Sequence, residues 1–430
     1  MSVHPAPPGP VANGRRRCRQ RPIAASSPRP SELLRLFFLT GLLFIAASAL
    51  AGIADAAAGT DWLHWLALHL LLLGGISQLV LGAGQFFVCA FLATDPPPRQ
   101  LIAAQLATWN VGTVLVAVGV PTGVSVLVEA GGGLIAAGLV LFAVALRWME
   151  RHSLQHAPWA LRWYQASAAC LGLGALIGVL MARGTSWSHG DLLGAHLALN
   201  LAGWLGTAII GTLHTFFPSL TQTQLRFPRL QRPTYILWLL GVIELAIGAV
   251  FTSRAVLAAG WTELLTAAAL LCANLLASLR IAPRPLVLPA RLLALAQTFL
   301  LAGLAIALAA TMRAGVNGPF TGTWRQVLAV LLLAGWIGLT VTGALLHLLT
   351  ILARIRRFTL AMPRPQPTLD RLITTGAASA VILLALSKTA AMTLLRLPSS
   401  VLTLTVVALL SMRLIGLAAR ALGPQRTAGR

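Results

Sequence analysis

The stretch NLAGWLGTAIIGTLHTFFP, residues 200–218, decides the fold class of this chain. It carries no acidic residue, lysine or arginine. A helix needs roughly 20 apolar residues to cross a bilayer core of about 30 Å, because it rises about 1.5 Å per residue. With the apolar residues that precede it, this stretch predicts a membrane-spanning helix at about residues 191–218.

The rest of the chain repeats this composition. Hydrophobic residues make up 57% of the 430, charged residues make up 10%, and the mean hydropathy is +0.82. A soluble globular chain has a much more even balance. We therefore predict an all-α, multi-pass membrane protein with about twelve transmembrane helices, at residues 32–54, 62–93, 100–120, 124–147, 161–183, 191–218, 233–254, 258–280, 288–311, 322–353, 370–388 and 398–421.

The arginines predict the orientation of these helices. The net charge is +22, and the arginines concentrate in the N-terminal tail and in alternate loops, at about residues 94–99, 148–160, 221–232, 280–284 and 354–369. The loops at 55–61, 121–123 and 184–191 hold few or no cations. The positive-inside rule then places both chain ends in the cytoplasm. No basic groove with interleaved aromatic residues is present, so nucleic acid is not an expected partner, and the lipid bilayer is.

The chain divides into one membrane domain and two short tails. Residues 1–31 are rich in Pro and Arg and poor in apolar residues, so we predict a disordered cytoplasmic tail. Residues 32–421 form the twelve-helix domain, and residues 422–430 form a second cytoplasmic tail.

An internal repeat divides the membrane domain into three units. Helices 2, 6 and 10 each contain a glycine, seven residues and a second glycine, and the copies are 129 and 132 residues apart. Each spacing corresponds to four helices. The pattern predicts three pseudo-repeated four-helix units, at about residues 32–147, 161–280 and 288–421, although glycine is also common in membrane helices for close packing alone. The glycine pairs are Gly74 and Gly82, Gly203 and Gly211, and Gly335 and Gly343.

Histidines within the spanning segments are the first candidates for a site, because ionisable groups are costly in a bilayer. His69 and His196 lie in the outer third of helices 2 and 6, and we predict them as ligands of a cofactor. His214 and His347 lie near the cytoplasmic ends of helices 6 and 10, and they are weaker candidates for a metal site. For each histidine, an imidazole that bonds only to a backbone carbonyl is the structural alternative.

Other polar residues in the membrane complete the candidate set. Asn200 and Thr207 share one face of helix 6 with His196, Gly203, Gly211 and His214. Glu244 lies near the middle of helix 7, where it serves either a proton or cation path or an interhelical hydrogen bond. The chain shows no phosphate loop, GxSxG elbow, HExxH or placed nucleophile. Whether it is an enzyme therefore stays open.

The three-unit pattern and the histidines on helices 2 and 6 resemble subunit I of the haem-copper oxidases. Three segments are more similar to the N-terminal membrane module of bacterial proteins described as copper oxidases or copper nitrite reductases: WLALHLLLLGGISQLVLGAGQFF (65–87), RWYQASAACLGLGALIGVLMARG (162–184) and HLALNLAGWLGTAIIGTLHTFFPSL (196–220). The resemblance implies a protein of the bacterial plasma (inner) membrane, with His69 as a haem ligand and His196 at the level of a copper ligand. It also implies a redox partner protein.

The sequence departs from that family at helices 7 and 10. Helix 7 has no His-His pair, and helix 10 has no His-x-His in its outer half. We therefore predict haem or copper binding, in respiration, metal handling or nitrogen-oxide response, without an oxygen-reducing binuclear centre. The alternatives are a transporter or permease, with Glu244 and the polar face of helix 6 lining its path, and a structural membrane subunit without a cofactor.

Overall fold

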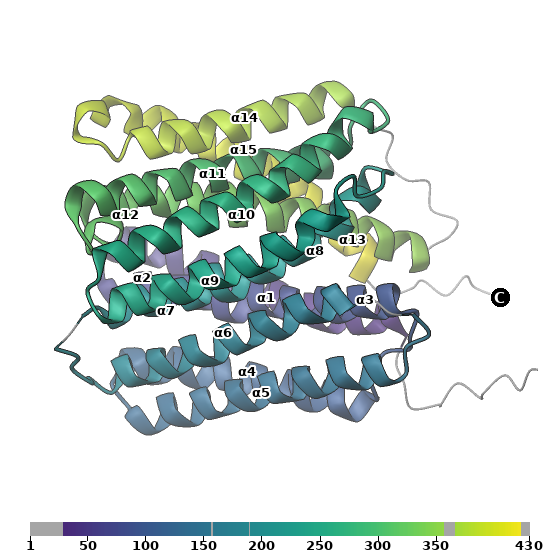
Figure 1. Ribbon diagram of the computed structural model, residues 1–430, viewed down its shortest axis with the longest axis horizontal. Coiled ribbons are helices and arrows are strands. Elements are labelled where there is room, and N and C mark those ends of the chain that lie inside the picture. The colour runs from purple at the N-terminus through teal and green to yellow at the C-terminus, as the bar shows by residue number, and fades with distance from the viewer. Residues whose placement is uncertain (1–28, 156–157, 189, 357–365, 423–430) are drawn as a thin grey trace, which may run out of the picture.

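A computed structural model of the chain describes residues 29–155, 158–188, 190–356 and 366–422. Within these residues it contains helices and no strand, and twelve helices are long and apolar enough to cross a membrane. They form a single bundle (Figure 1). In chain order the spanning segments are α1 (Pro30–Ala58), α2–η1–α3 (Asp61–His69, Leu70–Ile76, Ser77–Leu92), α4 (Arg99–Thr122), α5 (Ser125–Arg151), α6 (Pro158–Ala182), α7–η2–α8 (Leu192–Leu197, Ala198–Gly206, Thr207–Leu220), α9 (Gln231–Val250), α10 (Arg254–Ile281), α11 (Leu288–Ala314), α12–η5–α13 (Gly322–Ala329, Val330–Gly338, Leu339–Arg356), α14 (Pro367–Leu386) and α15 (Arg396–Leu422).

The predicted all-helical, multi-pass architecture is confirmed, and the differences lie at helix ends. Helix 7 was expected to end at residue 254, but α9 ends at Val250 and α10 already begins at Arg254. Ser253 caps α10, since its hydroxyl accepts a hydrogen bond from the backbone N–H of Val256 at 3.4 Å. Residues 30, 31 and 422 belong to helices, and the remainder of the two predicted tails lies outside the described residues except for Arg29.

Three spanning helices contain a π-helical segment near their centre. The segments are η1, η2 and η5. They lie in the second, sixth and tenth spanning helices, which we call helices 2, 6 and 10 in the order in which the chain crosses the bundle. Each contains the first glycine of the sequence pattern: Gly74, Gly203 or Gly335. A π segment shifts the hydrogen-bond register and leaves backbone carbonyls free to accept bonds from neighbouring helices. Such segments are frequent at functional sites.

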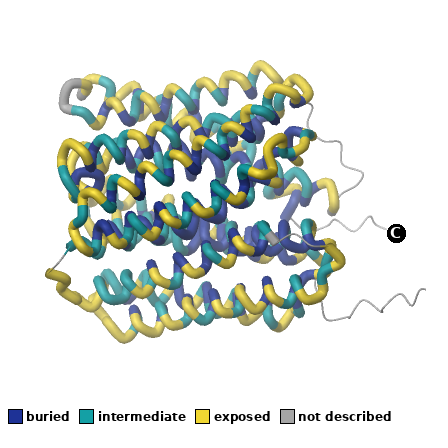
Figure 2. Tube along the Cα trace, in the orientation of Figure 1, coloured by how far each residue is buried: buried dark blue, intermediate teal, exposed yellow. Residues whose placement is uncertain are grey.

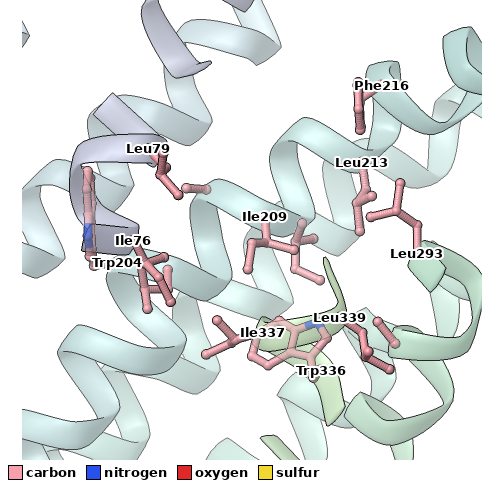
Figure 3. Close-up of a cluster of buried hydrophobic side chains, with 14 of the residues drawn as sticks. Ile76, Leu79, Trp204, Ile209, Leu213, Phe216, Leu293, Trp336, Ile337 and Leu339 are labelled. Atoms are coloured by element: carbon pink, nitrogen blue, oxygen red, sulfur yellow. The ribbon is translucent and has the colours of Figure 1, made fainter. Parts of the chain in front are cut away.

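The sixth spanning segment, α7–η2–α8, lies at the centre of the bundle. The twelfth, α15, lies at its edge. In their most apolar windows, 67% of the residues of Leu192–Leu220 are buried, against 11% of those of Arg396–Leu422. The tube in Figure 2 shows buried residues between the helices and exposed residues along their outer faces. Figure 3 shows the packed centre, where Trp204 of η2 and Ile209 of α8 lie among side chains of three other spanning helices. These side chains come from η1–α3, α11 and η5–α13. The exposed outer faces are rich in Leu, Val and Ile, as expected of surfaces that contact lipid.

The even number of spanning helices places the two described chain ends at the same end of the bundle (Figure 1). The arginine-bearing loops lie at this end too. We call it the terminal end, and the other the distal end.

A cysteine-labelling experiment checks the orientation of the bundle. In a variant that lacks the native cysteines, a cysteine placed at Gln155 marks the terminal end, and one placed at Thr185 is the matched marker of the distal end. An impermeant maleimide added to intact cells should label the second cysteine and not the first, since the positive-inside rule predicts that the arginine loops are cytoplasmic. Labelling at position 155 in intact cells would reverse the assignment.

Candidate functional site

The two outer histidines of the sequence analysis face each other in the structure. The ring centres of His69 and His196 lie 6.5 Å apart, with an angle of 28° between the ring planes. His69 is the last residue of α2, and His196 lies in α7, so each ring comes from the helical turn just before a π segment. Both are partly buried. The bundle thus brings together two imidazoles that are 127 residues apart in sequence.

Each of the two rings is held by a backbone carbonyl on one side. Nδ1 of His69 lies 2.9 Å from the carbonyl oxygen of Trp65, whose indole also stacks on the imidazole at 4.0 Å. Nδ1 of His196 lies 2.9 Å from the carbonyl oxygen of Gly174 in α6. A carbonyl oxygen only accepts, so each Nδ1 must carry the proton. The lone pair of each neutral imidazole is therefore on Nε2.

Two glycines of α6 make room for the polar side chains of helix 6. A Cβ atom on Gly178 would lie 2.9 Å from Cε1 of His196, and one on Gly174 would lie 2.5 Å from Nδ2 of Asn200. Asn200 donates to the carbonyl oxygen of His196 at 2.7 Å. Its amide nitrogen also lies 3.2 Å from Nδ1 of His196, but two donors cannot bond, so the Gly174 carbonyl determines the tautomer.

Three residues of the site were not predicted from the sequence: Trp65, Gly174 and Gly178. The available signal was the spacing of the two glycines, because residues four apart share one face of a helix. A small-residue face on α6 indicates close approach of another helix.

Most of the helix 6 face predicted as polar packs against α6 instead of lining a path. A Cβ atom on Gly203 would meet Cβ of Cys170 at 2.7 Å, and one on Gly211 would meet Cγ of Trp163 at 2.3 Å. Thr207 is fully buried and accepts a hydrogen bond from Nε1 of Trp238 at 3.2 Å. None of the residues of this face lines any of the three cavities described below.

The structure does not bring the two inner histidines ring to ring. His214 is buried and stacks with Trp163 at 5.8 Å, and its Nδ1 lies 2.8 Å from the carbonyl oxygen of Ile210. His347 contacts Phe216 at 5.4 Å. Nε2 of His214 is buried without a hydrogen-bond partner in the described part of the chain. A metal shared by His214 and His347 therefore stays a weak prediction.

Glu244 lies apart from the histidine pair, on α9. Its carboxyl group faces that of Glu263 on α10, and Oε2 of each is buried without a partner among the described residues. Neither carboxylate lines any of the three cavities. The structure therefore does not join Glu244 and the polar face of helix 6 in one path.

Among the described residues, the bundle contains at least three cavities. A small one of about 80 Å³ lies in the centre, among residues of the first, second, fifth, sixth, ninth and tenth spanning helices that include Tyr164 and Thr340. A large one of about 730 Å³ lies towards the distal end, and Leu68 and His64 are its only lining residues from helix 2. The third is polar and has a volume of about 220 Å³. Only the large cavity has the size of a typical cofactor pocket, and His69 does not line it.

The described residues contain no group of three or more His, Cys, Asp or Glu side chains that could hold a metal ion. Nε2 of His69 and of His196 makes no hydrogen bond in that part of the chain. The pair therefore offers a metal ion two neutral nitrogen donors. No third His, Cys, Asp or Glu of the described residues joins them.

The sequence matches no protein-family model and no curated protein. The resemblance to haem-copper oxidases stays a prediction from the motifs quoted above.

Proposed function

We propose that this chain is a membrane metalloprotein that binds one copper ion between His69 and His196. It serves metal handling or electron transfer in the bacterial inner membrane, on a scaffold like that of subunit I of the haem-copper oxidases. The observation that carries the proposal is the apposition of two imidazoles, each with its proton fixed on Nδ1 and a lone pair on Nε2. A carbonyl bond to the second ring nitrogen is the usual way in which proteins orient a ligand histidine.

The spacing of the rings suits a single ion. A metal–nitrogen bond is about 2 Å long, so two imidazoles on opposite sides of one ion have ring centres about 6 Å apart. The observed separation is 6.5 Å. A porphyrin would need a wide slot beside His69, and the large cavity does not reach that ring. Of the two predicted cofactors, the residues present therefore fit an ion better than haem.

The donor set favours copper among the metals that imidazole binds. Zinc in proteins is almost always bound by three or four protein ligands. Here two histidines stand without a third His, Cys, Asp or Glu in the described part of the chain. Cu(I) accepts two nitrogen donors, and imidazole is one of its ordinary ligands. Bound there, copper would supply one-electron chemistry or a transfer station for the ion.

The protein's own residues orient the donors and limit access to water. The carbonyl groups of Trp65 and Gly174 fix the tautomers, and the indole of Trp65 covers one face of His69. Gly174 and Gly178 let helix 6 approach α6 closely enough to place His196 beside His69. These contacts pre-organise the donors before an ion arrives.

Contacts that recur at the spacing of the sequence pattern support the repeated scaffold. Trp109 of α4 donates from Nε1 to the carbonyl oxygen of Leu73 at 3.2 Å, and Trp238 of α9 donates to that of Ala202 at 3.1 Å. Donors and acceptors are both 129 residues apart, and both acceptors lie in π segments.

Close glycine contacts repeat at the same interval of 129 residues. They occur between α4 and α5 and between α9 and α10. A Cβ on Gly131 would lie 2.8 Å from the carbonyl oxygen of Gly112, and one on Gly260 would lie 2.8 Å from that of Gly241. In the third unit the position of the tryptophan is taken by Asp370, which pairs with Arg413 at 3.0 Å. The recurring contacts therefore support the first two units most directly.

Metal analysis and a visible spectrum of the purified wild type test the proposal. We expect about one copper per chain in protein purified in detergent from copper-supplemented cells, and no Soret band. Zinc added in the same growth should not replace copper, because zinc lacks further ligands at this pair. A Soret band would assign haem instead, and a preparation free of both would remove the cofactor from the account.

A further inference from the structure

The distal end of the bundle holds an apolar cavity that adjoins a cationic one. The cavity of about 730 Å³ is lined mainly by Leu, Ala, Ile, Trp and Phe side chains of helices 6 to 10. The smaller cavity of about 220 Å³ is lined by Gln326, Leu384, Ser387, Lys388, Arg396 and Ser400. Gln326 and Lys388 line both, so the two cavities are neighbours with a shared wall.

Three cations around these cavities have no acidic partner. Arg325, Lys388 and Arg396 form no ion pair within the part of the chain that the structure describes. Another distal arginine, Arg183, pairs with Glu129 at 3.2 Å. Lys388 is also the single lysine among 32 basic residues.

The position of these cations runs against the orientation rule. The rule concentrates Lys and Arg at the cytoplasmic end, yet these three lie at the end opposite the arginine loops. All three residues are exposed, and an anion that binds beside the apolar cavity would lower the repulsion among their charges. A ligand with an apolar body and a negative group would complement both cavities.

We propose that this double cavity binds an anionic membrane lipid, with an acyl chain in the large cavity and the phosphate at Lys388 and Arg396. Arg and Lys are the ordinary partners of phosphate oxygens, and the amide of Gln326 supplies a further donor at the junction. An acyl chain that moves from the bilayer into this cavity stays among apolar groups, so the charged group of the lipid supplies the specificity. The surrounding bilayer is the source of such a molecule.

The alternative occupant is a porphyrin with its carboxylates at the same cations. The only imidazole that lines the large cavity is that of His64. Its side chain is 68% exposed, and its Nδ1 pairs with Asp55 at 3.2 Å. A buried axial ligand is thus lacking in the cavity, and the lipid is favoured.

Native mass spectrometry of the full-length protein in detergent tests this proposal. After delipidation, phosphatidylglycerol or phosphatidylcholine of equal chain length is added back. We expect one phosphatidylglycerol to be retained per chain, and the double variant Lys388→Gln with Arg396→Gln to weaken its retention by about tenfold or more. Arg420→Gln, at the terminal end of the same helix as Arg396, is the matched control and should behave as the wild type.

Further arms separate the parts of the ligand. Ala329→Phe narrows the large cavity and should also reduce retention, provided that its melting in detergent shows a folded protein. Displacement of the lipid by oleate would support recognition of an acyl chain with an anionic group. Equal retention of the two lipids, retention unchanged in the double variant, or displacement by inorganic phosphate alone would overturn the proposal. A Soret band lost in the double variant would assign the porphyrin.

Discussion

Gly211→Leu is expected to destabilise the protein severely, and Gly211→Ala to destabilise it measurably. A Cβ atom at this position would lie 2.3 to 2.7 Å from Cγ, Cβ and Cδ2 of Trp163, which is fully buried. The indole cannot move aside, because Tyr235 packs against its ring at 4.9 Å and His214 stacks with it. Forcing extra atoms into a packed core costs about 1–3 kcal/mol, occasionally more.

Helix propensity works in the opposite direction and provides the control. Alanine is about 1 kcal/mol more favourable than glycine in a helix interior. Gly133 of α5 is exposed, and a Cβ atom there would have no neighbour within 4 Å. Gly133→Ala and Gly133→Leu should therefore leave the melting temperature in detergent unchanged or raised, while the Gly211 variants lower it. Equal melting of the two leucine variants would show that helices 5 and 6 do not pack as described.

His69→Ala and His196→Ala are each expected to abolish copper retention. With two donors in total, the loss of one leaves a single nitrogen, and one imidazole does not hold the ion through purification. The fall should be about tenfold or more for each variant, and the double variant should fall no further. His152→Ala is the control, since that imidazole is exposed at the terminal end and bonds to the carbonyl oxygen of Trp148.

A second control separates copper loss from misfolding. His214→Ala removes a buried histidine of the same helix, so it tests whether any damage to helix 6 releases the ion. We expect it to lower stability and to keep copper. Full copper content in either His69→Ala or His196→Ala would remove that residue from the site.

The sequence predicted the number and type of the helices because lipid imposes a simple length and composition on each span. It missed the boundary between α9 and α10, where Ser253 caps a helix within an otherwise apolar run. It also gave no sign of the π segments themselves, because their residues are ordinary for a membrane helix. What it offered was the position of their glycines.

The sequence predicted the depth of the two site histidines in the membrane. It did not predict that their side chains lie next to each other. The register of helices 2 and 6 placed His69 and His196 in the same third of the membrane. Their contact depends on how closely helix 6 approaches its neighbours, which the small residues of α6 permit. Glu244 was predicted at mid-helix depth as a candidate for part of a path. Its carboxyl group instead faces Glu263 on the adjacent helix and lines none of the described cavities.

X-ray absorption at the copper edge, on copper-loaded protein kept reduced, tests whether His69 and His196 hold the ion. We expect a low coordination number with two nitrogen donors and the outer-shell scattering of imidazole. His69→Ala should give no copper edge above background, because that variant does not retain the ion. Sulfur donors, or copper without imidazole scattering in the wild type, would contradict the assignment of the ion to His69 and His196.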